Sequence, residues 1–128
     1  MEKDTVDECD GQERFRRWVL DVLRLLSSPP SVQLEFLKSV RVGADELLLQ
    51  FDDLIRAAHG RLVFDSMNEE EYGQLQHVET FVNSVNEAGA YIWSDDALCS
   101  SAEWANLRAA AGETRQQLAD RWELWQYL

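Results

Sequence analysis

The side chains in this sequence that could most readily take part in catalysis or bind a metal are carboxylates in three close groups. Asp52-Asp53, Glu69–Glu71 and Asp95-Asp96 supply the residue types that general acid–base catalysis or a hard divalent metal would need. The last two groups stand where helices are expected to begin, and acids there interact favourably with the helix dipole. Asp52 precedes Arg56 by four residues, which is the spacing of an ordinary surface ion pair on a helix. We therefore favour a structural interpretation of these acids over a catalytic one.

Histidine and cysteine give no pattern typical of a reactive centre. His59 and His77 have no acid or cysteine at metal-ligand spacing on the same helical face, and neither a serine elbow nor a phosphate-binding glycine loop occurs. Cys9 and Cys99 lack a CxxC partner and are expected to be free thiols in a reducing compartment, with a disulfide between them as the alternative. We expect no enzyme activity, no metal site and no cofactor.

Charge is distributed unevenly along the chain, whose formal net charge is −12. Residues 1–64 contain nine Lys or Arg and twelve Asp or Glu, whereas residues 65–128 contain three and twelve. Lys and Arg are absent between Arg61 and Arg108. Such a field repels nucleic acid and anionic lipid and attracts a basic protein. We expect neither direct nucleic-acid binding nor membrane binding.

The location of the protein follows from two further segments. Residues 1–13 are too acidic for a secretory signal, and the apolar run Trp18–Leu26 is too short and too charged to span a bilayer. We expect a cytoplasmic protein.

Apolar residues at spacings of three and four predict amphipathic helices, and hence an all-α fold. The first helix runs from about Phe15 to Leu26 and ends at the Ser27–Pro30 segment, because proline cannot continue a helix. A shorter helix ends at Gly43. A third begins at Asp45 and ends at Gly60, and Arg61–Phe64 is a buried connection or a helical turn.

Two serine signals predict the starts of later helices. The Ser66–Glu69 capping-box spacing begins a fourth helix that runs to about Glu87. Ser94 caps a short turn, and Ser100–Glu103 begins a last helix that runs across Gly112 to the C-terminus. These elements predict one domain over residues 12–128, a bundle of four long helices plus one or two short ones, preceded by a flexible acidic tail over residues 1–11.

The aromatic residues add candidates for binding. Trp18 and Trp104 fall on core stripes, whereas Trp93 lies in a connection beside Asp95 and Asp96, where an aromatic ring among carboxylates suits a cationic surface. The C-terminal cluster forms either core or an exposed patch; it comprises Trp122, Trp125 and Tyr127. An exposed patch would serve a partner or self-association, so the oligomeric state stays open.

Two segments resemble small, acidic, all-helical bacterial immunity-type proteins, which accompany toxins. They are Glu46-Leu47-Leu48-Leu49-Gln50-Phe51-Asp52-Asp53-Leu54 and Ile92-Trp93-Ser94-Asp95-Asp96-Ala97-Leu98, followed by Trp104 and Leu107. The resemblance implies stoichiometric inhibition of a basic toxin, often a nuclease, by covering its active cleft.

The leading hypothesis is a non-enzymatic acidic protein that docks and inhibits a basic protein partner, in the manner of an immunity protein or antitoxin. Its candidate binding residues are one aromatic anchor and six carboxylates: Trp93, Glu69, Glu70, Glu79, Glu87, Asp95 and Asp96. The alternative is a regulatory or scaffold domain that binds through an apolar groove. Mimicry of nucleic acid ranks lower because the acids are not in regular rows, and an acid-pair enzyme with a divalent metal ranks below both binding hypotheses.

Overall fold

A computed structural model describes the backbone of residues 2–63 and 67–128, and the side chains of residues 11–62 and 67–128. Within these ranges helices joined by short connections are the regular secondary structure and no strand occurs, which confirms the predicted all-α bundle. The helices are α1 (Glu2–Ser27), α2 (Pro30–Val40), α3 (Asp45–Val63), α4 (Glu69–Asn86), α5 (Asp95–Ser100) and α6 (Ala102–Trp122). Two short 3-10 turns are η1 (Ala90–Trp93) and η2 (Trp125–Tyr127).

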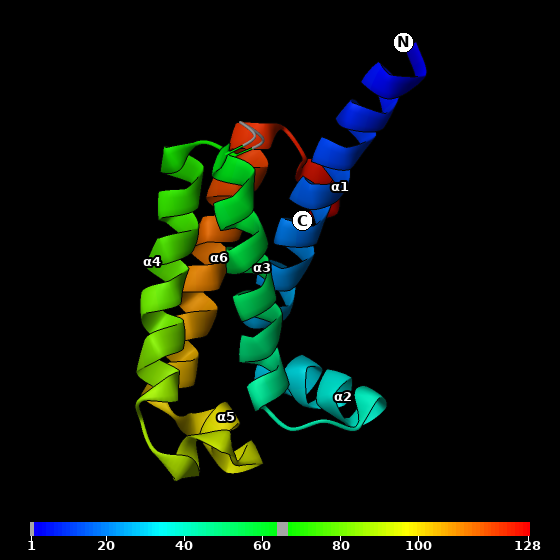
Figure 1. Ribbon diagram of the computed structural model, residues 1–128. Helices are drawn as coiled ribbons and strands as arrows, with labels where there is room; N and C mark the ends of the chain where they lie inside the picture. The colour runs from blue at the N-terminus through cyan, green and yellow to red at the C-terminus, as the bar shows by residue number, and fades with distance from the viewer. Residues whose placement is uncertain (1, 64–66) are drawn as a thin grey trace.

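The four long helices, α1, α3, α4 and α6, stand side by side with alternating direction (Figure 1). Helix α6 packs most extensively, against α1 on one side and α4 on the other, while α3 contacts the same two helices more sparsely. The short helices α2 and α5 lie together at the lower end of the bundle in Figure 1. This arrangement is an up-down-up-down bundle with α2, η1 and α5 across one end.

The core is built from the stripes that the sequence predicts. On α6, Trp104, Leu107, Leu118 and Trp122 are buried, and the indole Nε1 of Trp104 donates to the carbonyl oxygen of Ile92 at 2.8 Å. The stripe continues across Gly112, which lies inside α6 as predicted, so the helix is not broken there. Burial of side chains of this size contributes roughly 1.5–3 kcal/mol each relative to exposure.

A polar network joins four helices at the lower end. The amide Nε2 of Gln33, which is fully buried, donates to the carbonyl oxygens of Leu25 and Leu26, both at 3.0 Å. The guanidinium of Arg108 donates to Gln33 Oε1 and to the carbonyl of Leu98, again at 3.0 Å. Burial lowers the pKa of Arg108. The network therefore satisfies the last carbonyls of α1 with α2, and ties both to α5 and α6.

A second network joins α4 to α6 at the upper end. Glu71 is only 3% exposed, and its carboxylate accepts from the backbone N–H of Asn68, from Arg121 Nε and from Trp122 Nε1. The Asn68 side chain accepts from the Glu71 N–H in return, which completes a capping box. Although α4 starts near the predicted position, its cap is Asn68; Ser66, the predicted cap, lies outside the described residues.

Several helix ends differ from the predictions. Helix α3 continues through Gly60 to Val63, because the packing of α3 against α1 and α4 outweighs the cost of this glycine, which is about 1 kcal/mol. Residues 2–11, predicted as a flexible tail, continue α1 as helix and project past the bundle in Figure 1. They contain no proline to stop the helix.

Two helices end at a residue other than glycine, and α2 ends before the predicted Gly43. Arg41 ends α2 and Glu123 ends α6, both in the left-handed conformation with φ of 58° and 56°. Helix α6 therefore does not run to the C-terminus. The last residues turn back in η2, where the ring of Tyr127 lies under the guanidinium of Arg17 at 4.5 Å. Helix α6 is capped by Ser101, one residue after the predicted Ser100.

The tryptophans divide between core and surface. Trp104 and Trp122 are buried, whereas Trp125 is 52% exposed and donates to Asp120. Trp18, predicted to be core, is 38% exposed because its side of α1 opens onto a hollow beside α2. It packs edge-to-face on Phe15.

The Gln33 network predicts a large effect for a small polar side chain. Replacing Gln33 by Ala removes the side-chain donor to the Leu25 and Leu26 carbonyls and one of the two acceptors of the Arg108 guanidinium, so we expect a loss of about 1–3 kcal/mol in the free energy of unfolding. Urea unfolding followed by circular dichroism measures it. The exposed Gln76→Ala on α4 is the matched control and should change stability by less than about 0.5 kcal/mol. Equal effects of the two variants would show that the network is not stabilising.

Neighbouring acids at the start of α4 should behave differently. Glu71→Ala strands the buried Nε1 of Trp122 and removes half of the capping box, so we expect a loss of about 3 kcal/mol. Glu70→Ala removes only an exposed pair with Arg121 and should cost less than about 1 kcal/mol. Thermal and urea unfolding of both variants compare them, and a Glu70 effect as large as that of Glu71 would contradict the assignment.

Candidate partner-binding groove

The predicted binding residues do not form a single cluster; they lie along the length of α4 and at the lower end. Glu69 and Glu70 are exposed at the upper start of α4, and Glu70 forms an ion pair with Arg121 at 3.1 Å. Glu87, near the other end, lines a separate hollow with Glu103 and Asn106 between α4 and α6. The upper pair is therefore partly neutralised and distant from the remaining candidates.

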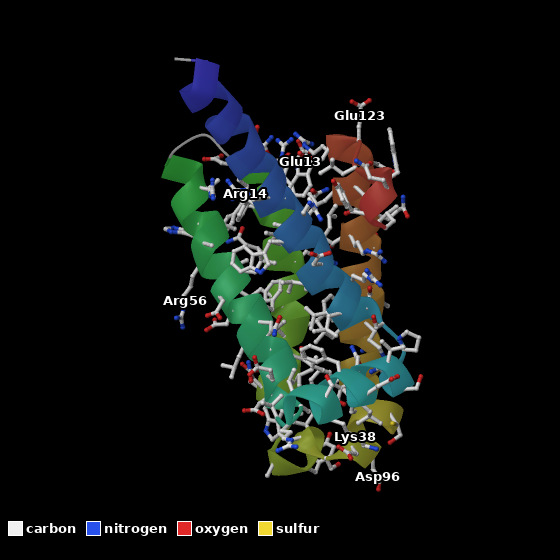
Figure 2. The ribbon with its side chains drawn as sticks, turned by 90° about the vertical axis from the view of Figure 1, so that its right-hand side faces the viewer. Glu13, Arg14, Lys38, Arg56, Asp96 and Glu123 are labelled. Carbon is white, nitrogen blue, oxygen red and sulfur yellow. The ribbon has the colours of Figure 1, made fainter. Side chains whose placement is uncertain are left out.

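Asp95 and Asp96 are exposed in the first turn of α5, where Ser94 caps the helix by accepting from the Ala97 N–H. Figure 2 shows Asp96 and Lys38 at the same lower end of the molecule, and α2, which carries Lys38, contacts α5. Both aspartates favour the helix dipole, and the lysine offsets their field. The segment around Asp95 and Asp96 is acidic in the sequence, but in the structure the lower end of the molecule carries both negative and positive side chains.

Glu79 and Trp93 come together at one surface. They line a hollow of 260 Å³ between α3 and α4, together with Asp45 and Asp52 from the beginning and middle of α3. From the sequence, Asp45 is expected to begin a helix and Asp52 to form a surface pair, and neither is among the predicted binding residues. The available signal was their seven-residue spacing, which places two acids near one face of a helix.

A second hollow continues the first along the same seam. It has a volume of 460 Å³ and is lined by Asp52, Ile55, Arg56, His59, Tyr72 and Glu79. Asp52 and Glu79 line both hollows, so the two form one surface, which we name the α3–α4 groove. Its apolar floor consists of side chains that are 1–6% exposed: Leu48, Phe51, Ile55 and Val82.

Aromatic rings stand at both ends of the groove. At the lower end Trp93 is half-buried and packs edge-to-face on Trp104, with ring centroids 6.3 Å apart. At the upper end Tyr72 is half-buried against His59, with centroids 5.8 Å apart. Contact with the core holds these rings in place, which makes them suitable anchors for an apolar or cationic side chain.

The groove carries a net negative charge. Asp45, Asp52 and Glu79 supply three carboxylates, and Arg56 is the cation that lines it. Arg56 pairs with Asp52 at 2.7 Å, yet its side chain is 75% exposed and projects outward from α3 in Figure 2. Within the described part of the chain, Asp45 and Glu79 form no ion pair. An incoming cation would therefore meet carboxylates that are not already committed to internal pairs.

Other reactive side chains do not assemble into a site. His77 is exposed and packs edge-to-face on Phe81, and Cys99 is an exposed free thiol; the Cys9 side chain lies outside the described residues. Among the described residues no group of histidines, cysteines and acids has the arrangement of a metal site. None of the helices searched over those residues is long and apolar enough to cross a membrane.

Comparisons with protein-family models, curated proteins and solved structures give no match for this chain.

The Asp52–Arg56 pair predicts that the charge of the groove can be altered without affecting the fold. Arg56→Gln removes an exposed pair of side chains four residues apart, so the free energy of unfolding should change by less than about 0.5 kcal/mol. Urea unfolding beside the wild type measures this. A loss above about 1.5 kcal/mol would show that Arg56 has a structural role that its exposure does not reveal.

Proposed function

We propose that this chain is a non-enzymatic, cytoplasmic binding protein that docks a basic protein partner on its α3–α4 groove. The observation that carries the proposal is the placement of Asp45, Asp52 and Glu79 around an apolar floor, beside the half-buried ring of Trp93. Carboxylates would speed encounter with a cationic surface, and apolar contacts with the floor and the ring would slow dissociation.

The acids outside the groove extend its field. Glu87, Asp95 and Asp96 lie towards the lower end of α4 and on α5, where they would steer a basic partner without needing direct contact. Glu69 and Glu70 belong to the other end and contribute less, because Arg121 already pairs with Glu70. The main candidate binding residues are therefore Glu79 and Trp93, and Asp45 and Asp52 supplement them.

Inhibition of a basic toxin, in the manner of an immunity protein or antitoxin, is the form of this function that the sequence resemblance implies. Both segments behind the resemblance contribute to the groove. Glu46–Leu54 lies on α3 and forms part of one wall of the groove, and Ile92–Leu98 includes Trp93. A surface of this kind would act by covering a cationic cleft, so inhibition would be stoichiometric.

A second candidate function rests on a different surface. Trp18 and Val32, exposed by 38% and 46%, line a hollow of 480 Å³ between α1 and α2 with Leu25 and Phe36. A regulatory or scaffold domain would use such an apolar groove, with the charge of the chain serving solubility.

Salt dependence separates the two candidates. The partner is captured from the native host, purified, and titrated against the wild type by calorimetry between about 50 and about 300 mM NaCl. The acidic-docking proposal predicts that Kd rises about tenfold over this range, and that Glu79→Lys with Asp95→Lys and Asp96→Lys weakens binding and flattens its salt dependence.

The control reverses three acids elsewhere: Glu35→Lys, Glu113→Lys and Glu123→Lys. This variant has the same net charge, so equal weakening would indicate a general charge effect and no defined docking face. A Kd that does not change with salt concentration, together with loss of binding in Trp18→Ala, would support binding through the apolar hollow between α1 and α2 and contradict acidic docking.

A further inference from the structure

We propose that the α3–α4 groove receives one cationic amphipathic helix of the partner, with apolar side chains at positions i and i+7 and Lys or Arg at i+3 and i+4. This inference rests on the proposed function and specifies the form of the ligand. It follows from the spacing of the two hollows, the position of the acids between them and the charge of the walls.

The two hollows are six to seven residues apart along both walls. On α3 the lower hollow is centred near Leu49 and the upper one near Ile55; on α4 the centres lie near Val82 and Gln76. With a rise of 1.5 Å per residue, this separation is about 10 Å. A ligand that fills both must therefore present two side chains about 10 Å apart on the same face.

A helix meets this condition and an extended strand does not. Two turns of α-helix bring residues i and i+7 onto one face at a separation of about 10 Å. In an extended strand about 10 Å corresponds to three residues, and side chains three apart point to opposite faces. The hollows, of 260 and 460 Å³, are large enough for side chains from the docked face.

The acids lie where the middle of that helix would be. Asp52 and Glu79 line both hollows, so they stand at the junction between them, on opposite walls. Side chains at i+3 and i+4 lie between i and i+7 on the same face. Lysine or arginine there would reach one carboxylate on each wall, and Asp45 would attract a further cation near the lower end.

The walls also exclude the opposite charge pattern. Helix α4 carries no Lys or Arg from Glu69 to Asn86. On α3 the exposed Arg56 pairs with Asp52, and an exposed pair of this type contributes only about 0.2–1 kcal/mol. A cation of the partner can therefore replace Arg56 at small cost, whereas an acidic helix would meet three carboxylates.

The test selects binding peptides without assuming a sequence. A displayed library of random peptides of about 16 residues, long enough for four helical turns, is panned against the immobilised wild-type protein. The expected result is enrichment of sequences with apolar residues at i and i+7 and Lys or Arg at i+3 or i+4. The tightest peptide is then titrated by fluorescence anisotropy, and its helicity on binding is followed by circular dichroism.

Two protein variants locate the contact. Asp52→Asn with Glu79→Gln removes both junction charges with isosteric side chains and should weaken the peptide about tenfold. Glu35→Gln with Glu123→Gln is the matched control, because both are exposed acids that line none of the hollows between α3 and α4, and it should change Kd less than about twofold. Unfolding curves confirm that both variants are folded.

The outcomes distinguish this inference from the proposed function. Cationic peptides that lack the seven-residue spacing, or that bind both variants alike, would overturn the helix-in-groove inference and leave acidic docking standing. Enrichment of neutral or acidic peptides, or of none, would overturn both.

Discussion

The burial of α6 between α1 and α4 is the constraint on which the rest of this structure depends. Its stripe from Trp104 to Trp122 occupies the centre of the bundle, and hydrogen bonds fix it at both ends, to Ile92 below and to Glu71 above. Because α6 takes the most extensive contacts of α1 and α4, α3 closes the bundle with sparser packing. The seam between α3 and α4 consequently keeps two hollows over an apolar floor. The candidate site is thus a consequence of where the core is densest.

The same packing divides the carboxylates of the chain by role. Glu71 is buried and holds α4 to α6, and Glu70 pairs with Arg121. Asp95 and Asp96 begin α5 at the lower end of the bundle, where Lys38 also lies. Asp45 and Glu79 remain without an ion pair in the described part of the chain. The linear excess of negative charge in residues 65–128 contributes Glu79 to the α3–α4 groove. The other two groove carboxylates, Asp45 and Asp52, come from α3, which lies in the more balanced half of the linear charge pattern.

Periodicity predicted most of the fold, because a stripe of apolar residues determines both a helix and the face it buries, as Leu75, Val78, Val82 and Val85 on α4 show. It failed where tertiary packing decides the outcome. Gly60 is predicted to end a helix but lies within α3. Trp18 is predicted to be buried in the core but faces a hollow between α1 and α2. For the site, Glu79 and Trp93 were identifiable from charge and loop position. The spacing of Asp45 and Asp52 places both acids near one face of α3, but nothing local to α3 tells that this face will meet α4 across an open seam.

The central claim is that negative potential is concentrated in the α3–α4 groove, and its most direct test uses small charged probes. Proton relaxation caused by a cationic nitroxide is compared with that caused by its anionic analogue, residue by residue, in the NMR spectrum of the free protein. The account predicts the largest cationic-to-anionic ratios at protons lining the groove on α3 and α4, around Asp52 and Glu79. Larger ratios at the upper end near Glu69, or similar ratios over the whole surface, would contradict it.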